Sequence, residues 1–273
     1  MVNFSLHKIG AAFIAALFFF TTYSQNNPKT EFEVFKDYKR LGYTVRPVFY
    51  SKATINRKFG DYELINKKTF NFNFGFDYLI HPERKWAFKS GLHLDIVPLY
   101  NIEFDIKEGD IWSGYEGYQE DSNIYKLNFA IPLLVQFKKQ MAYNLFFNLE
   151  MGFHFMIMQQ GGFDVTYLFS NEELSESREI FAMYGNATNP TSIYPNLILS
   201  PGFYFTFPGI LLQTNVIFQK PIVPFFKGEY QFGNLLESGP TRGDYKNSGE
   251  YLGLLFTVHL KKKMKHTNNE FDY

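Results

Sequence analysis

Three histidines are the side chains best suited to hold a metal ion. His93, His154 and His259 belong to the six histidines of the chain, which has no cysteine. Zinc requires ligands that converge within about 2.1 Å of one point, whereas these three are expected at different depths along separate strands. No H-E-x-x-H motif is present. We therefore expect neither a metal site nor a cofactor site, and histidines that are satisfied by polar neighbours.

A second set of side chains has the types that catalysis uses. Ser200, Tyr204, Glu150 and His154 offer a hydroxyl, a carboxylate and an imidazole. A hydrolase would hold its serine in a motif such as G-x-S-x-G, and no such motif frames Ser200. We therefore expect no catalytic residues.

A third set is acidic and aromatic, and it suits binding better than catalysis. The stretch 102–123 holds many carboxylates against Lys107 alone, without the spacing of an EF-hand calcium loop. The same stretch contains aromatic side chains, which are common in protein interfaces. Solvated acidic loops that resist aggregation are the alternative. The candidate partner or cation surface comprises Asp105, Glu108, Asp110, Trp112, Tyr115 and Tyr118.

The elements that position these side chains follow a period of two. In 70–80, aromatic residues alternate with small or polar ones, which is the pattern of a β-strand with two unlike faces. Similar runs give about eight strands of about ten residues, the length that a tilted strand needs to cross a bilayer. The expected strands are 41–50, 70–80, 86–96, 125–137, 145–155, 196–207, 210–219 and 251–260.

The connections between these strands alternate strictly in length. Long connections at 51–69, 102–123, 159–194 and 220–250 alternate with short turns at 81–85, 139–144 and 208–209. Outer-membrane barrels have long loops outside the cell and short turns in the periplasm. The pattern predicts an all-β protein, an eight-stranded antiparallel up-and-down transmembrane β-barrel in the outer membrane, with lipid as its surroundings.

The two faces of the strands differ in charge. The aromatic face has almost no charge and is expected to contact lipid, whereas the other face carries six charged residues that sum to zero. Eight strands leave an interior that side chains fill, so these charges are expected to plug the lumen. Pairing across the turn 81–85 would place Asp77 opposite Lys89 and Asn73 opposite His93, with Arg46 near Asp77. The predicted lumen network comprises Arg46, Asp77, Lys89, Asp95, Lys126 and Glu150.

Composition agrees with an exported membrane barrel. Aromatic residues make up 20% of the 273 residues, and the formal net charge of zero gives no pull toward nucleic acid. Residues 1–24 have Lys8, an apolar run and small residues before Gln25, as in a cleavable signal peptide; an N-terminal helical anchor is the alternative. We expect a periplasmic segment at 25–39, the barrel at 40–260 and a basic periplasmic tail at 261–273. Residues 30–40 would form either a short amphipathic helix or an irregular lead-in.

One strand resembles a known family. The segment Tyr125–Phe137, with Ile131-Pro132-Leu133-Leu134 at its centre, and the following Leu149-Glu150-Met151-Gly152 are similar to the PorT-like outer-membrane β-barrel proteins of Bacteroidota. The resemblance implies an eight-stranded barrel but no single activity. Some members of the family are accessory parts of the type IX secretion system, and most have no assigned role. The chain departs from many outer-membrane barrels in the tail that follows Leu260. Pro47, Pro98, Pro132 and Pro201 fall inside expected strands and should mark bulges or strand ends.

Three hypotheses about function remain. The leading one is a barrel without catalysis, which binds an envelope or secretion-system partner through its acidic outer loops or organises the cell envelope. The second is a narrow channel or small-solute binder, which requires a water-filled path. The third is a lipid-modifying enzyme or protease of the outer membrane, which requires a nucleophile and a base at one depth.

Overall fold

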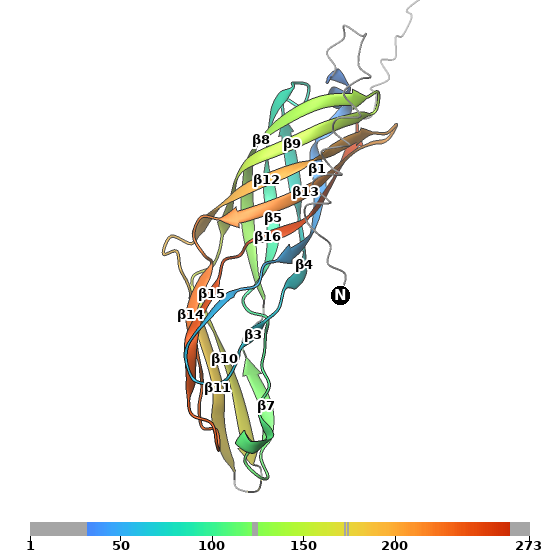
Figure 1. Cartoon of the computed structure of the whole chain (residues 1–273). Coiled ribbons are helices and arrows are strands. Elements are labelled where there is room, and N and C mark those ends of the chain that lie inside the picture. The colour runs from blue at the N-terminus through green and yellow to red at the C-terminus, as the bar shows by residue number, and fades with distance from the viewer. Residues whose placement is uncertain (1–31, 122–124, 172, 174, 263–273) are drawn as a thin grey trace, which may run out of the picture.

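Eight long strands close into an antiparallel barrel. The computed structural model describes residues 32–121, 125–171, 173 and 175–262; the expected signal peptide, the start of the periplasmic segment and most of the basic tail lie outside them. Neighbours in the barrel follow chain order, and the first strand pairs with the last, so the predicted up-and-down barrel is confirmed (Figure 1). Its strands are β1 (Tyr38–Tyr50), β4 (Thr69–Ile80), β5 (Trp86–Pro98), β8 (Tyr125–Ala142), β9 (Leu145–Ile157), β12 (Ile193–Thr206), β13 (Ile210–Pro221) and β16 (Tyr251–Lys261).

The alternation within each strand sorts the side chains into two environments. On β4, Phe72 is 47% exposed while Asn73 and Asp77 are fully buried. On β8, Leu127 and Phe129 are 59% and 55% exposed. These exposed apolar side chains surround a barrel whose inward positions carry the buried polar and charged residues, which is the arrangement of a barrel in lipid. The hydrophobic belt that the sequence predicts is therefore present.

The prolines disturb the strands less than expected. Pro98 ends β5, as the pattern predicts. Pro47, Pro132 and Pro201 lie within strands, and the register on either side of each is unchanged, without a bulge. Each strand has two neighbours, and a proline removes the single backbone donor toward only one of them.

The long extracellular connections form a second sheet. Six strands that the sequence analysis treats as loops pair in the order β2-β15-β14-β11-β10-β7, beyond one end of the barrel (Figure 1). They are β2 (Thr54–Phe59), β15 (Thr241–Asn247), β14 (Phe226–Phe232), β11 (Glu176–Ala187), β10 (Gly162–Asn171) and β7 (Glu116–Asp121). We call this six-stranded sheet the outer sheet.

One face of the outer sheet is covered by the chain that follows β5. This segment contains β6 (Ile102–Glu103), which pairs with β3 (Ile65–Asn66), and the 3-10 helix η2 (Glu108–Asp110). The ring centroid of Phe104 lies 4.6 Å from that of Phe181 on β11 and 5.2 Å from that of Phe232 on β14. The outer sheet thus packs on a hydrophobic core that continues into the barrel, where it includes Val48 and Met156. The opposite face of the outer sheet carries exposed ion pairs such as Lys58–Asp244.

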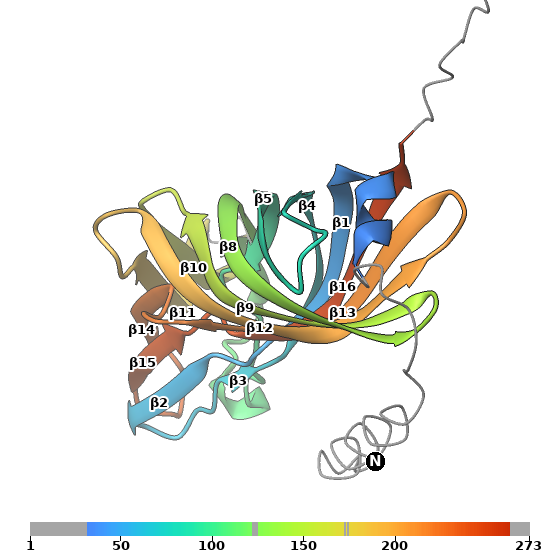
Figure 2. The ribbon, with the colours of Figure 1, turned by 90° about the horizontal axis from the view of Figure 1, so that it is seen from above.

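The periplasmic end is closed by the residues that precede β1. The 3-10 helix η1 (Glu33–Asp37) lies beside β1 and β16 at the mouth of the barrel (Figure 2). Phe35 is buried, with its ring centroid 5.0 Å from that of Phe146 on β9 and 5.2 Å from that of Tyr204 on β12. The helix expected at 30–40 is found only in part, as a 3-10 helix limited to Glu33–Asp37, and residues 38–40 already belong to β1. Within the described residues, no helix has the length and apolar character needed to cross a membrane.

Candidate functional site

The barrel interior contains a network of buried ion pairs. Arg46 on β1 donates to Asp95 on β5 over 2.5 Å. Nζ of Lys89 lies 2.7 Å from Glu150 on β9 and 3.3 Å from Asp77 on β4. The side chains of all five residues are at most 1% exposed. The structure thus brings together five of the six lumen residues named from the sequence.

The partners differ from the predicted ones because the register across the turn 81–85 is shifted. Asp77 pairs with Gly91 rather than with Lys89. A shift of two residues keeps every side chain on its expected face, and Lys89 is long enough to reach Asp77 nevertheless. Arg46 is paired across β1 and β4 with Asn73, so its guanidinium meets Asp95 instead of Asp77. The predicted Arg46–Asp77–Lys89 cluster is therefore wrong in one of its two contacts.

Lys126 does not join this network. It lies near the outer end of β8, where its Nζ donates to the backbone oxygen of Gln159 over 2.6 Å and stands 5.9 Å from the ring centre of Phe226. Its side chain is half-buried, at the border between the barrel and the outer sheet. Without Lys126, the network named from the sequence retains two cations, Arg46 and Lys89, against three carboxylates.

Uncharged side chains complete the coordination of Glu150. Gln136 on β8 and Gln213 on β13 donate to Oε1 of Glu150 over 2.5 and 2.7 Å. Gln136 also donates to the Tyr204 hydroxyl over 2.9 Å. Neither glutamine is among the lumen residues named from the sequence, although both occupy the same inward alternation as the charged residues. Buried carboxylates that accept several hydrogen bonds are better stabilised than isolated pairs.

Two histidines extend the network. Nδ1 of His93 lies 3.1 Å from Nε2 of His154, so the expectation that these residues sit at different depths is wrong for this pair. Nε2 of His93 faces Asp77 at 2.8 Å, and Nδ1 of His154 faces Oε1 of Gln219 at 2.8 Å. β5 and β9 are staggered in the barrel, so residues at different positions along the two strands reach the same depth. His259 is separate and faces the backbone oxygen of Lys39 at 3.2 Å.

The contacts of this histidine pair are satisfied by two neutral rings. His93 donates from Nε2 to Asp77, and its Nδ1 accepts from Nε2 of His154. Nδ1 of His154 then accepts from the Gln219 amide, with the amide turned so that its nitrogen faces the ring. The pair therefore fills the lumen without adding a charge.

The interior offers little for catalysis. The Ser200 hydroxyl accepts from Nδ2 of Asn215 over 3.0 Å, whereas His154 faces His93 and Gln219, so no described contact joins Ser200 to a base. Among the residues that the structure describes, no group of three or more His, Asp or Glu side chains is arranged to hold a metal ion. The arrangement suits filling and stabilising the lumen.

The acidic and aromatic residues named from the sequence divide into a buried anchor and an exposed group. Asp110 is buried and accepts from the Tyr62 hydroxyl (2.5 Å), the Ser238 hydroxyl (2.5 Å) and the amides of Glu237 and Ser238 (2.9 and 2.6 Å). Burial opposes ionisation, but these hydrogen bonds outweigh it and lower the pKa of Asp110 to about 2. The residue therefore joins three connections, and its carboxylate is not available to a partner or a cation.

The remaining members lie at the tip of the outer sheet. The Arg178 guanidinium stands 4.0 Å from the ring centre of Trp112 and 5.5 Å from that of Tyr115. The Tyr115 hydroxyl donates to Glu176 over 2.8 Å. We call Trp112, Tyr115, Glu176 and Arg178 the tip cluster. Glu176 and Arg178 lie in the long connection 159–194, which is also acidic, and are not among the surface residues named from the sequence.

The other residues of the candidate partner or cation surface are Asp105, Glu108 and Tyr118, which are close in sequence to Trp112 and Tyr115. Asp105 and Glu108 are exposed on the segment that covers the outer sheet. Tyr118 belongs to the edge strand β7, where its backbone is paired with Leu168 on β10. The proposed surface is therefore discontinuous, because the buried Asp110 lies between its exposed members.

Comparisons with known proteins give distant likenesses only. No family model matches the chain, and no curated protein matches it. The crystal structure of the outer-membrane protein OprG from Pseudomonas aeruginosa is similar over 84% of this chain and 99% of that one, with 11% identity and a TM-score of 0.40. Ail, the attachment invasion locus protein of Yersinia pestis, is similar over 80% of this chain and 99% of its own, with 11% identity and a TM-score of 0.27.

The resemblance to PorT-like proteins accordingly stays a prediction. The structure itself decides the broad class, since a closed barrel with an apolar exterior and a polar, ion-paired interior is stable only with lipid around it. The chain is an integral outer-membrane β-barrel protein.

Proposed function

We propose that the protein is a barrel without transport or catalytic activity, which holds the outer sheet at the cell surface for binding a protein partner of the cell envelope. The observation that carries this proposal is the filling of the barrel. Lys89, Asp77 and Glu150 form ion pairs at its centre, and Phe35 packs across the periplasmic mouth. A barrel filled in this way serves as an anchor, and its function then resides in what it carries outside the membrane.

The tip cluster supports partner binding at the outer sheet. Tryptophan, tyrosine and arginine are the side chains that contribute most to protein interfaces. Here Arg178 lies over Trp112 and Tyr115, and the half-buried rings are held in place before any partner arrives. Preorganised side chains lose less conformational entropy on binding. Asp105 and Glu108 add negative charge nearby, which favours a basic partner surface.

Two measurements test this proposal. In planar bilayers, the purified protein should show no steady open conductance, and a large, steady one would contradict the anchor role. In native membranes, a photo-crosslinking amino acid at Trp112 should give one discrete adduct. The matched control is the same substitution at Tyr184, which is 49% exposed on the outer sheet but lies away from the tip cluster. Equal labelling at both positions would count against a tip interface.

The alternatives lead to different results. A narrow channel would give small, ion-selective conductance that changes when Glu150 is replaced. An outer-membrane lipid-modifying enzyme or protease would need a base beside Ser200, and the described neighbour of that hydroxyl is Asn215. A small-solute binder is favoured by one specific observation, a cavity in the core of the outer sheet.

A further inference from the structure

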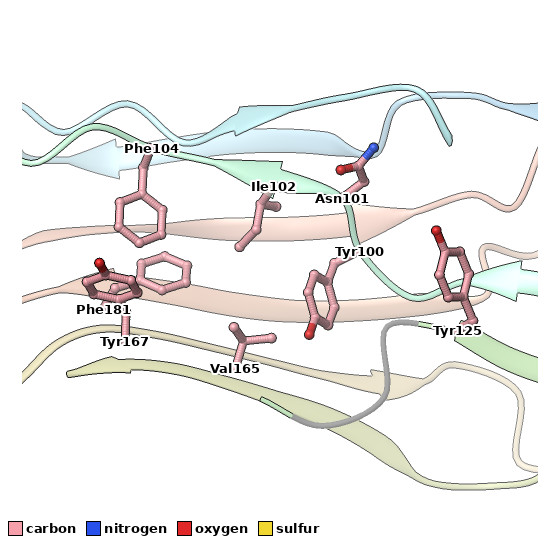
Figure 3. Close-up of a pocket in the computed structure, with 8 residues that line it drawn as sticks. All are labelled: Tyr100, Asn101, Ile102, Phe104, Tyr125, Val165, Tyr167 and Phe181. Atoms are coloured by element: carbon pink, nitrogen blue, oxygen red, sulfur yellow. The ribbon is translucent and has the colours of Figure 1, made fainter. Parts of the chain in front are cut away.

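A cavity of about 250 Å³ lies where the outer sheet meets the barrel. On one side are residues of the segment that follows β5, and on the other are residues of β10 and β11 (Figure 3). It is lined by Tyr100, Asn101, Ile102, Phe104, Tyr125, Val165, Tyr167 and Phe181. Close-packed interiors leave few voids larger than a water molecule, so a space of this size is unusual in a hydrophobic core.

The lining defines the chemistry of a ligand. Five of the eight described lining residues are aromatic, two are aliphatic and the remaining one is Asn101, so none of these eight side chains is charged. The Val165 and Phe181 side chains on its inner wall are 1% exposed. These aromatic and aliphatic side chains attract an apolar group by the hydrophobic effect, while polar atoms contribute to the accessible lining to a similar extent, which suits a ligand with both an apolar group and a polar end. A charged ligand would lose its hydration there without gaining a counter-ion.

One lining residue of the cavity also belongs to the lipid-facing surface. Tyr125 begins β8 and has the same outward alternation as Leu127 and Phe129, which belong to the apolar belt. It is 46% exposed and lines the cavity as well. Tyrosines of outer-membrane barrels mark the boundary between hydrocarbon and water. Tyr125 therefore places one side of the cavity at the outer-leaflet interface, where amphiphilic molecules concentrate.

We propose that this cavity is a binding site for the apolar group of an uncharged amphiphile at the outer-leaflet interface. A cavity of about 150 Å³ holds one benzene ring, so this one fits an alkyl chain or a fused two-ring group of about ten heavy atoms. The hydroxyl of Tyr125 and the amide of Asn101 lie at the side where the polar end of the ligand would remain. The site is independent of the tip cluster and adds small-ligand binding to the proposed anchor role.

The methyl groups of Ile102 and Val165 report on the site directly. The full-length protein in lipid nanodiscs, labelled at isoleucine and valine methyls, is titrated with naphthalene. Ring currents should shift both methyl resonances in a saturable manner. In a second arm, a phospholipid with a nitroxide near the end of its acyl chain replaces naphthalene. Broadening of the Ile102 methyl identifies a membrane lipid chain as the source, whereas naphthalene shifts alone identify a free solute.

Ile102→Trp fills the cavity and should weaken naphthalene binding at least about tenfold, as read from the Val165 methyls. Ile106→Trp is the matched control, because Ile106 is a half-buried isoleucine of the same segment that does not line the cavity. Val165→Met, read from the Ile102 methyl, repeats the test with a smaller change. The proposal is overturned if neither probe perturbs the methyls, or if Ile106→Trp weakens binding as much as Ile102→Trp.

Discussion

Replacing Asp110 by asparagine should loosen the tip of the outer sheet and leave the barrel unchanged. The carboxylate accepts hydrogen bonds from Tyr62, from the amide of Glu237 and from the amide and hydroxyl of Ser238. These bonds lower its pKa from 3.8 to about 2 despite its burial. A depression of this size corresponds to about 2 kcal/mol of stability, and screening by water near the tip reduces it to about 1–2 kcal/mol.

The loss is measured by hydrogen exchange followed by mass spectrometry. In Asp110→Asn, peptides that cover 104–112 and 233–240 should exchange about 5 to 30 times faster at neutral pH. Peptides from β8 and β9 should not change. The matched control is Asp105→Asn, which removes an exposed carboxylate from the same segment.

The same carboxylate predicts a pH dependence with a definite sign. Because the folded-state pKa of Asp110 lies below its unfolded value, the stabilisation is complete above about pH 4. It should disappear as the pH falls from about 4 to 2, and the wild-type tip should then exchange as fast as that of Asp110→Asn, after correction for intrinsic rates. Equal exchange in Asp110→Asn and Asp105→Asn at neutral pH would refute the reasoning.

Three further changes test the barrel. Lys89→Met leaves Asp77 and Glu150 buried without their cation and should destabilise the barrel by about 3–5 kcal/mol, seen as loss of the fast gel mobility of the unboiled protein at a lower temperature. Phe35→Ala should release the segment at the periplasmic mouth, seen as faster proteolysis near residue 35 in periplasm-facing vesicles while the barrel mobility persists. Gly152→Ala should reduce refolding yield, because the backbone angle φ is +152° and an added Cβ would lie 2.3 Å from a strand carbonyl oxygen.

The sequence predicts the barrel strands well because lipid and lumen demand opposite side chains at every second position. Phe72 faces the lipid side and Asn73 faces the lumen, and this alternation continues over more than ten residues in β4. The turn between β4 and β5 contains no such information about register, so the partner of Asp77 was displaced by two residues. The long side chain of Lys89 still reaches Asp77 despite that displacement, whereas Arg46 pairs with Asp95 instead.

The outer sheet was harder to predict for a physical reason. Its strands also alternate, as Phe163, Val165 and Phe169 do on β10. They pair, however, with strands of other connections, for example Val165 with Asp121 of β7. Their stability comes from a core shared among four connections, and no single segment carries that signal. Asp110 was misplaced for the same reason, since its hydrogen-bond donors are remote in the chain.

The helix η1 has a consequence for biogenesis. It crosses the joint where the two ends of the barrel meet, because the backbone oxygens of Asp37 and Lys36 accept from Lys262 just beyond β16. Phe35 at the same time reaches β9 and β12 on other parts of the wall. The contacts of η1 with Lys262 and with the rings on β9 and β12 are complete only after β1 and β16 have paired. An insertion intermediate in which β1 and β16 are not yet paired would therefore leave Phe35 unburied. The contacts of η1 then stabilise only the last step of assembly, the closure of the barrel.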